Sequence, residues 1–485
     1  MLVQDIQIVI LFLGTDQLES NVQNARVIWC SERKTRSNAQ ILSVIMLNRE
    51  IVVNVVGAGL AGSEASLYLS ANGVKVNLFD MKPKQKTPAH KNDCFAEIVC
   101  SNSLKSKLPT TASGMLKGEL EIMGSRLLEI AKENAVDAGG ALAVDREKFS
   151  SCVTELIRSD KNINIIQENV TKIDVSQPTI IATGPLTSKE LMSEIERISG
   201  VKSSFFFDAK APIIATDSID MNYAFWGNRY DKGETDGDYL NCPMNKEEYE
   251  TFYDALIHAE TIELKEFEKE GKVFESCMPI EVMAKRGADS LRYGPLKPVG
   301  LVDPRTGKRA YAVLQLRKEN REGSMLNMVG FQTNLKFGEQ KHVFGLIPAL
   351  KNAEFLQYGV MHRNSYVLAP LVLNQYLQIK NAPNVFIGGQ LSGVEGYVES
   401  IASGLLAAIN ILKYIKCENL LKLPQTTCLG GIINYITNYE GNNFQPMNAN
   451  FGVVACNRQL PKDKAEARKI MYDISMREME KIFKE

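Results

Sequence analysis

The sequence has no Cys-x-x-Cys pair and no Cys/His spacing of the kind that holds a metal ion, although it contains nine cysteines. These cysteines are scattered and odd in number, which fits reduced cytoplasmic thiols better than a disulfide framework or a zinc site. No apolar run approaches the ~20 residues that a membrane-spanning helix needs. We therefore expect a cytoplasmic protein with no bound metal and no membrane partner.

Net charge is also nearly absent, since 56 Lys and Arg residues balance 57 Asp and Glu residues to leave −1. Overall charge therefore excludes no class of partner, and only its distribution along the chain is informative. Internal repeats and low-complexity segments are lacking too. At 485 residues the chain is too long for one core, and two or three domains are expected.

The first 45 residues match neither a signal peptide nor the start of a domain. Their short apolar stretch, Ile8–Leu13, follows Asp5 instead of Lys or Arg and has no small-residue cleavage site. A dinucleotide-binding domain begins within a few residues of its first strand, and a start at Met46 would satisfy that rule. We expect residues 1–45 to be a translated upstream segment or a dispensable N-terminal extension, whose deletion leaves cofactor binding and activity intact.

The most informative motif is a glycine-rich turn between a predicted strand and a predicted helix. The β-branched run from Val52 leads into G-x-G-x-x-G, and a second strand ends at Asp80, eighteen residues after Gly62. Such glycines allow a tight turn, close approach of a pyrophosphate and close helix packing, and the carboxylate can accept ribose hydroxyls. An ordinary Gly-rich turn is the alternative. The predicted dinucleotide contacts are Gly57, Ala58, Gly59, Leu60, Ala61, Gly62 and Asp80.

A second glycine-rich turn favours FAD over NAD(P). A strand predicted at 384–389 enters it and a helix predicted at Ile401–Lys416 follows, so the helix N-terminus can face the flavin. FAD is long and is commonly held by two such turns, whereas NAD(P) needs one. A turn that serves only packing is the alternative. The predicted contacts here are Gly389, Gln390, Gly393 and Gly396.

The two turns are separated by a stretch of different character. We therefore predict an α/β fold, with a split Rossmann-like FAD-binding domain at residues 46–200 and 340–456 and an inserted α+β domain at 201–339. Residues 457–485 are predicted to form a charged C-terminal helix on the surface. Within the first domain, Gly118–Ala135 is predicted to form one helix.

The inserted segment concentrates positive charge. Between Lys285 and Arg321, ten Lys and Arg residues accompany three Asp and Glu residues and interleave with Tyr293 and Tyr311. Cations neutralise phosphates and aromatic rings stack on bases, and the Gly/Pro content indicates loops that suit RNA better than duplex DNA. A merely solvated face is the alternative. The predicted RNA-binding residues are Lys285, Arg286, Arg292, Lys297, Arg305, Lys308 and Arg309.

Two cysteines stand out by their context. Cys277 is followed by Lys285 and Arg286, which can stabilise a thiolate, and a thiolate beside an RNA-binding surface suggests nucleophilic attack on a base. Cys100 lies in the long loop after the second strand, at a position that should face the flavin. A buried, inert thiol is the general expectation for a cytoplasmic cysteine and is the alternative for both.

Taken together, these motifs resemble those of the folate- and FAD-dependent tRNA (uracil-5-)-methyltransferase family. The resemblance runs in consistent order from about Ile51 to Cys456, and residues 1–45 fall outside it. It rests on GAGLAGSEAS, FAEIVCSNSLKS, SGMLKGE, ALAVDREKFS, CMPIEVMAKRG, LRYGPLKPVGL, MHRNSY and IGGQLSGVEGYVES.

The resemblance implies a flavoenzyme that transfers the methylene of 5,10-methylenetetrahydrofolate to uracil C5 in the T-loop of tRNA, with NADPH or NADH as reductant. It implies that the Cys277 thiolate adds to uracil C6, and that Cys100 is a partner of the flavin or the base that removes the C5 proton. It also implies folate contacts at His362, Arg363 and Asn364, for which the residues alone suggest structural hydrogen bonding.

Other functions remain open at this stage. Close relatives with the same architecture methylate a uridine of large-subunit ribosomal RNA. A small-molecule flavin oxidoreductase would leave the basic segment merely solvated, and a flavin-stabilised RNA-binding protein would have no turnover. Transfer of labelled methylene into unmodified tRNA separates the methyltransferase from the last two.

Overall fold

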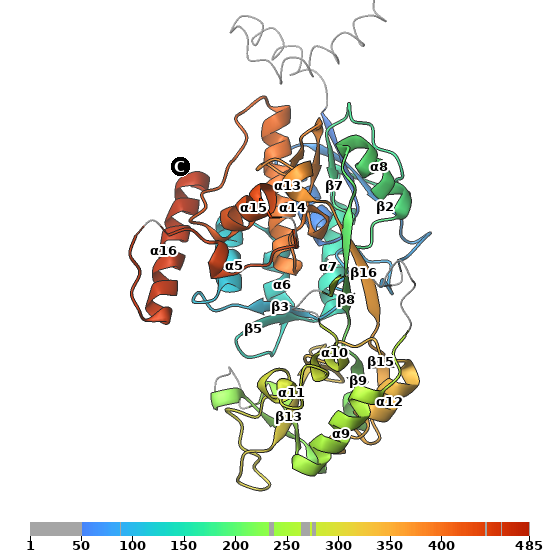
Figure 1. Cartoon of the computed structure of the whole chain (residues 1–485). Helices are drawn as coiled ribbons and strands as arrows, with labels where there is room; N and C mark the ends of the chain where they lie inside the picture. Colours follow the sequence, from blue (N-terminus) through green and yellow to red (C-terminus); the bar gives the residue numbers. More distant parts are fainter. Residues whose placement is uncertain are drawn as a thin grey trace, which may run out of the picture.

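The computed structural model describes residues 51–484, except 88, 232–236, 263–271, 274–277, 442–443 and 457. The described elements form two large hydrophobic cores, which lie one above the other in Figure 1. Cys277, the predicted nucleophile, lies outside the described residues.

The larger core is built on a mostly parallel six-stranded sheet. Its strands, in spatial order, are β17 (Gln378–Ile379), β18 (Ala382–Ile387), β7 (Thr179–Ile181), β1 (Val52–Val56), β2 (Lys75–Asp80) and β6 (Ile163–Gln167). Every neighbouring pair is parallel except β17 and β18. Because β18 comes from the last third of the chain and pairs with β7, the sheet joins two distant segments. The predicted α/β, Rossmann-like fold is confirmed.

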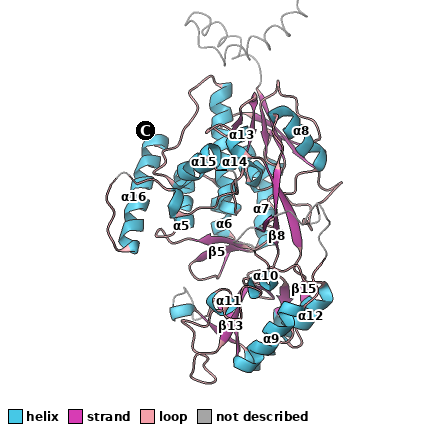
Figure 2. Cartoon of the chain, in the orientation of Figure 1, coloured by secondary structure: helices cyan, strands magenta, loops and turns pink. Residues whose placement is uncertain are grey.

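Helices and one small sheet complete this part of the molecule (Figure 2). The helices are α4 (Leu60–Ala71), α5 (Ala112–Ile122), α6 (Arg126–Glu133), α7 (Arg146–Ser159), α8 (Lys189–Ser199), α13 (Ala369–Val372), α14 (Tyr397–Ile415), α15 (Cys428–Asn438) and α16 (Lys464–Phe483). The small sheet has the order β3 (Ser103–Ser106), β5 (Ala141–Val144) and β4 (Ala135–Val136). The single helix expected over 118–135 is two helices, because Gly124 adopts φ 76° and Ser125 caps α6.

Helix α14 is buried along nearly its whole length. Among the described helices it is the one long and apolar enough to cross a membrane, but 89% of its apolar stretch is buried inside the protein. Its apolar run is longer than we expected of any segment of this chain, and its burial identifies it as a core helix. Close packing on α4 follows from Gly404, where an added Cβ would lie only 2.6 Å from Ala61 Cα.

The second core surrounds an antiparallel six-stranded sheet. Its strands, in spatial order, are β10 (Phe225–Gly227), β11 (Tyr239–Met244), β13 (Ala312–Lys318), β14 (Met325–Met328), β9 (Ile213–Ala215) and β15 (Phe355–Gln357). The described residues of this region include the helices α9 (Lys246–His258), α10 (Ile280–Ala284), α11 (Ser290–Tyr293) and α12 (Phe337–Phe344).

A three-stranded sheet connects the two regions. Strand β8 (Ser204–Ala209) pairs antiparallel with β16 (Met361–Tyr366) and parallel with β12 (Lys272–Val273). In Figure 1, β8 and β16 run side by side from the upper core toward the lower one. The chain thus enters and leaves the second core through paired strands.

The predicted boundary at residue 340 is wrong, because it falls inside α12. The second core continues through Val343, Phe344 and Leu350, all of which are fully or almost fully buried. Phe344 packs edge-on against Phe331 at 5.2 Å between ring centroids. The burial of apolar residues up to β15 therefore places 340–357 with the inserted region rather than with the cofactor domain.

The predicted C-terminal helix is less of a surface element than its charge suggested. Met471 and Met479 of α16 are buried in the larger core. Between them, the Ser475 hydroxyl donates a hydrogen bond to the buried Glu119 carboxylate of α5 at 2.5 Å. The same carboxylate accepts the backbone N–H groups of Cys428 and Leu429 at the start of α15. One buried carboxylate thus joins three helices.

Candidate active site

The first glycine turn has the geometry of a dinucleotide cradle. Gly57 adopts φ +99°, and an added Cβ would lie 2.7 Å from the Ala182 carbonyl oxygen of the neighbouring strand. At Gly62 an added Cβ would overlap the Gly57 carbonyl oxygen, so helix α4 packs directly on the turn. Gly59 differs, because an added Cβ there would meet nothing within 4 Å. The space over Gly59 is therefore free for a ligand at the N-terminus of α4.

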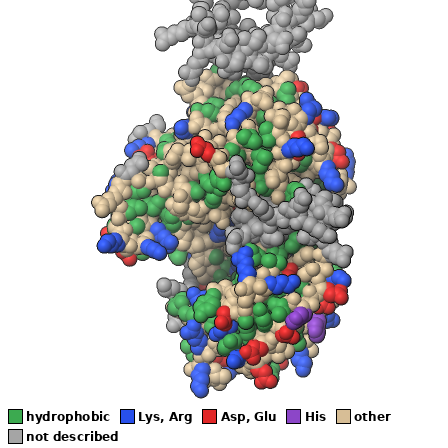
Figure 3. Space-filling view, in the orientation of Figure 1, with side chains coloured by type: hydrophobic (Ala, Val, Ile, Leu, Met, Phe, Trp, Pro, Cys, Tyr) green, Lys and Arg blue, Asp and Glu red, His purple; other side chains and the backbone are tan. Residues whose placement is uncertain are grey.

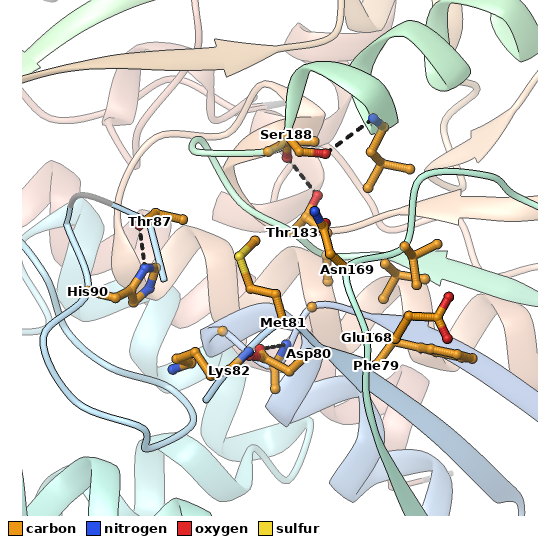
Figure 4. Close-up of a pocket in the computed structure, with 18 of the residues that line it drawn as sticks. Phe79, Asp80, Met81, Lys82, Thr87, His90, Glu168, Asn169, Thr183 and Ser188 are labelled. Atoms are coloured by element: carbon orange, nitrogen blue, oxygen red, sulfur yellow. Dashed lines mark hydrogen bonds between the residues drawn. The ribbon is translucent and has the colours of Figure 1, made fainter. Parts of the chain in front are cut away.

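Asp80 lies beside this turn at the end of β2. Its carboxylate accepts the backbone N–H of Ala58 at 2.9 Å and that of Lys82 at 2.8 Å, which fixes its orientation. Figure 4 shows Asp80 and Lys82 on one side of a cleft, with Thr183 and Ser188 on another. The cleft runs from the glycine turn past Asp80 to His90, whose ring nitrogen Nδ1 lies 2.6 Å from the Thr87 hydroxyl. Its lining, with the glycine turn and the Asp80 carboxylate side by side, suits a nucleotide.

The second glycine turn packs against the first. Gly389, Gly393 and Gly396 adopt φ of 74°, 93° and 119°, conformations that residues with side chains rarely take. An added Cβ at Gly389 would lie 2.9 Å from the Cβ of Ala61 in α4. Gln390 turns inward to hydrogen-bond the Glu395 carboxylate of the same loop. The two turns thus form one continuous wall, as a long dinucleotide such as FAD requires, and the residues present fit that group.

A buried carboxylate and a lysine meet where this wall ends, at the N-terminus of α14. Glu399 is buried, and one of its carboxylate oxygens accepts Lys105 Nζ at 2.9 Å while the other lacks a hydrogen-bond partner within the described part of the chain. Lys105 adopts φ 62°, which is uncommon for a residue with a side chain and marks functional sites. An added Cβ at Gly396 would lie 2.9 Å from Lys105 Nζ. Sequence reasoning missed both residues.

Cys100 is held in place beside this end of the wall. Its backbone N–H donates to the Tyr397 hydroxyl at 2.6 Å, and its carbonyl oxygen accepts the Arg146 guanidinium at 2.8 Å. The Cys100 Sγ lies 4.0 Å from the Ala209 carbonyl oxygen at the end of β8. The backbone of Cys100 is therefore fixed by contacts from α7 and α14, and its side chain lies at the junction with the connecting sheet.

Arg146 links this loop to the second core. Its Nε donates to Glu319 Oε2 at 2.6 Å and its Nη2 to Glu319 Oε1 at 3.1 Å, a two-point ion pair. Burial acts to lower the pKa of Arg146, and the Glu319 carboxylate more than offsets it, so the pKa is raised. Arg146 stays charged. No local pattern indicates this pair, because its members are 173 residues apart in the sequence.

A cavity of about 600 Å³ lies between the two cores next to this ion pair. Arg146, Lys210, Glu97 and Gln357 are among its lining residues. Burial lowers the pKa of Lys210 to about 8. Glu97 Oε2 is buried and has no hydrogen-bond partner among the residues that the structure describes. The cavity therefore offers both a cation and a carboxylate oxygen to a ligand.

The predicted folate residues lie on β16, next to the connecting strand β8. His362 and Arg363 pair with Asp208 and Phe207 in the backbone register, and their side chains lie outside the described part of the structure. Asn364 is buried. Their assignment as folate contacts stays a prediction.

The predicted RNA-binding residues differ in whether their side chains already make ion pairs or stacking contacts within the protein. Arg292 stacks on the Tyr311 ring at 3.6 Å and pairs with Asp289, and Arg305 makes a two-point pair with Asp303. The remaining five are exposed: Lys285, Arg286, Lys297, Lys308 and Arg309. On the face drawn in Figure 3, basic and acidic side chains are interspersed over the lower core. Tyr293, however, is 82% exposed in the same segment and is available for stacking.

No group of three or more His, Cys, Asp or Glu side chains that could hold a metal ion occurs in the described part of the chain. Two ion pairs occur near the site, Arg146 with Glu319 and Lys105 with Glu399.

Comparison with known proteins identifies the family. Residues 52–419 match the family of glucose inhibited division protein A. Methylenetetrahydrofolate–tRNA-(uracil-5-)-methyltransferase TrmFO of Caldicellulosiruptor bescii is 54% identical over 423 residues, which cover 87% of this chain and 96% of that protein. The protein of the same name from Bacillus cereus is 53% identical over 415 residues, covering 86% and 95%.

Solved structures agree on the fold. GidA of Aquifex aeolicus superposes with a TM-score of 0.65 at 15% identity, covering 90% of this chain and 73% of that one. The sequence match and the arrangement of the two glycine turns lead to one conclusion: the chain belongs to the methylenetetrahydrofolate–tRNA-(uracil-5-)-methyltransferase TrmFO family.

Proposed function

We propose that this protein is an FAD-dependent enzyme that methylates C5 of a uridine in the T-loop of tRNA, with 5,10-methylenetetrahydrofolate as the one-carbon donor. One observation carries the proposal. The paired glycine turns form a dinucleotide wall that ends at Cys100, in a chain 54% identical to a protein named for that reaction. We further propose that the enzyme works in the cytoplasm and uses NADPH or NADH as its reductant.

The FAD site is assigned to the two turns. Gly57, Gly59 and the N-terminus of α4 would hold the pyrophosphate, and Asp80 the ribose. The N-terminus of α14, with Gly396 and Lys105, would face the flavin end. When bound, FAD supplies the electrons that complete the methyl group.

Two cysteines carry the covalent chemistry in this proposal. Uracil C5 is a poor nucleophile until a thiolate adds at C6, and Cys277 is assigned that addition. The resulting C5 enolate forms a bond to the methylene carbon that methylenetetrahydrofolate supplies, whose bond to the folate nitrogen breaks. Cys100 then removes the proton from C5, and the electron pair of that C–H bond forms the C5–C6 double bond as the Cys277 thiolate leaves. Folate contacts are assigned to His362, Arg363 and Asn364.

RNA contacts are assigned to the exposed cations of the inserted region. Lys285, Arg286 and Lys297 lie close in sequence to the exposed ring of Tyr293. Lysines and arginines neutralise the phosphate backbone, and an exposed tyrosine stacks on an unpaired base. Because enzymes that modify a base within folded RNA must take it out of its stack, the target uridine is expected to leave the T-loop and enter the cavity beside Cys100.

Transfer of labelled methylene from methylenetetrahydrofolate into unmodified tRNA tests this function. The holoenzyme should label tRNA, Cys277→Ala should not, and the exposed Cys152→Ala should label as well as the wild type. Full labelling by Cys277→Ala would show that the nucleophile is misassigned. A transcript of large-subunit ribosomal RNA, labelled while tRNA is not, would refute the choice of substrate and leave the chemistry standing.

A further inference from the structure

A column of stacked aromatic rings rises to the surface at the start of α12. The Phe337 ring stacks on Tyr358 with 4.9 Å between centroids and 19° between planes. Tyr358 in turn stacks on Phe355 at 5.3 Å and 2°. Phe337 is nevertheless 51% exposed, and Leu356, which follows Phe355 in β15, is 45% exposed. The column therefore ends in a large ring that is about half exposed.

Hydrogen bonds fix the backbone on both sides of this column of rings. Gln340 of α12 donates from its side-chain amide to the carbonyl oxygens of Leu335 and Gly359, at 2.7 and 2.9 Å. Its side-chain oxygen accepts the Gly359 N–H at 2.8 Å. Gln340 is fully buried, so these bonds are shielded from water. They clamp the residues on either side of Phe337 and Tyr358 together, and a ring fixed in this way loses little entropy when a ligand stacks on it.

The column also stands at the edge of the catalytic cavity. Leu356 and Gln357, which lie between the two inner rings in sequence, line the cavity that contains Arg146 and Lys210. Lys91 Nζ donates to Gln357 Oε1 at 2.6 Å across this edge. The backbone N–H of Ile280, three residues after Cys277 in the sequence, donates to the Gln332 carbonyl oxygen at 2.7 Å. Two residues of the segment that carries the inner rings therefore line this cavity.

A flat ring on a ladder of nearly parallel rings is suited to one further flat ring. RNA supplies such rings, and a base taken out of its stack leaves its neighbour with one face bare. A cation nearby fits an accompanying phosphate, because Lys341 is exposed on α12, whereas Lys336, just before the helix, is paired with Glu260 at 2.5 Å.

We propose that Phe337, backed by Tyr358, is a stacking platform for the nucleobase next to the target uridine. The proposal rests on the proposed RNA substrate and adds a site for a second, unmodified base. Stacking of one base on an aromatic side chain contributes a factor of about 5 to 150 in affinity.

The test uses holoenzyme and a T-arm RNA hairpin that carries 2-aminopurine beside the target uridine, since the fluorescence of this base falls when it stacks. Phe337→Ala and Phe337→Leu should weaken hairpin binding at least fivefold and leave the 2-aminopurine bright in the complex, whereas Phe337→Trp should bind and quench like the wild type. Leu371→Ala, which removes a 60% exposed apolar side chain of α13, is the matched control and should change neither.

The outcomes separate the platform from the proposed function. Wild-type affinity and wild-type quenching in both Phe337→Ala and Phe337→Leu would overturn the platform. If the wild-type enzyme methylates the hairpin in that case, the proposed function is retained and only the stacking platform is overturned. If the wild-type enzyme does not bind the hairpin at all, both proposals are overturned. Phe337→Leu keeps an apolar contact with Tyr358, so a loss seen in it as well as in Phe337→Ala reports the missing ring rather than a loosened α12.

Discussion

Two glycines of the FAD cradle, Gly59 and Gly62, should respond differently to the same substitution by alanine. Gly59 has φ −74° and ψ −166°, which alanine adopts freely, and its Cβ would meet no protein atom within 4 Å. Gly59→Ala should therefore leave the stability of the apoprotein within about 0.5 kcal/mol of the wild type. Its methyl group occupies the space reserved for the pyrophosphate. Loss of one hydrogen bond to a charged group costs about 2 kcal/mol, or about thirtyfold in the Kd for FAD.

Gly62→Ala should do the reverse. Its Cβ would overlap the Gly57 carbonyl oxygen, so α4 must move away from the turn and the apoprotein should lose about 1–3 kcal/mol. Thermal melting of both apoproteins and titration with FAD, followed by flavin fluorescence, measure the two effects separately. Gly338→Ala, on open surface in α12, is the control for both measurements. Wild-type FAD affinity in Gly59→Ala would refute the placement of the pyrophosphate.

Three further variants test the buried polar groups. Burial raises the pKa of Glu119 from 4.5 to about 7, so its contribution to stability is full below pH 4.5 and is lost as the pH rises through 7. The difference in free energy of unfolding between Glu119→Gln and wild type should therefore shift in favour of the variant by about 2–3 kcal/mol as the pH rises from 5 to 8. Urea titrations that give the same difference at every pH in this range would contradict this. Glu319→Gln leaves the Arg146 charge buried without its counter-ion and should cost about 3 kcal/mol by chemical denaturation, whereas a cost below about 1 kcal/mol would show that the pair is solvated. Tyr397→Phe removes the acceptor of the Cys100 N–H, so alkylation of Cys100, followed by mass spectrometry, should become several times faster, and an unchanged rate would show that Arg146 alone fixes the loop.

The parts of the fold that the sequence predicted are those with a local cause. A glycine is needed at residue 57 because φ is +99° there, and the run before it has to be a strand for the turn to form. The same reasoning found Gly389, Gly393 and Gly396. A break in the helix expected over 118–135 had a local cause as well, since Gly124 and the capping Ser125 follow one another. That signal was present and was overlooked.

The parts that escaped prediction depend on contacts between distant residues. Nothing in the residues around Tyr397 shows that its hydroxyl will meet the backbone of Cys100, 297 positions earlier. Likewise the apolar residues of α12 show that one face is buried, but not which core buries it. Phe344 belongs to the second core because its ring packs against that of Phe331 there. The domain boundary was therefore misplaced by the length of one helix and one strand.

Arg146 connects the Cys100 loop to both cores. Its helix belongs to the larger core, its guanidinium binds the Cys100 carbonyl oxygen, and its counter-ion Glu319 follows β13 of the second core. A displacement of the second core would draw Glu319 away and leave a buried cation unpaired, which is costly, so Arg146 and the Cys100 loop should follow the movement. Asn102 reinforces this coupling, since its side chain donates to the carbonyl oxygens of both Val144 and Lys318. The position of Cys100 thus depends both on the larger core, assigned to the cofactor, and on the second core, assigned to RNA. RNA that binds to the second core can therefore change the position of the Cys100 thiol.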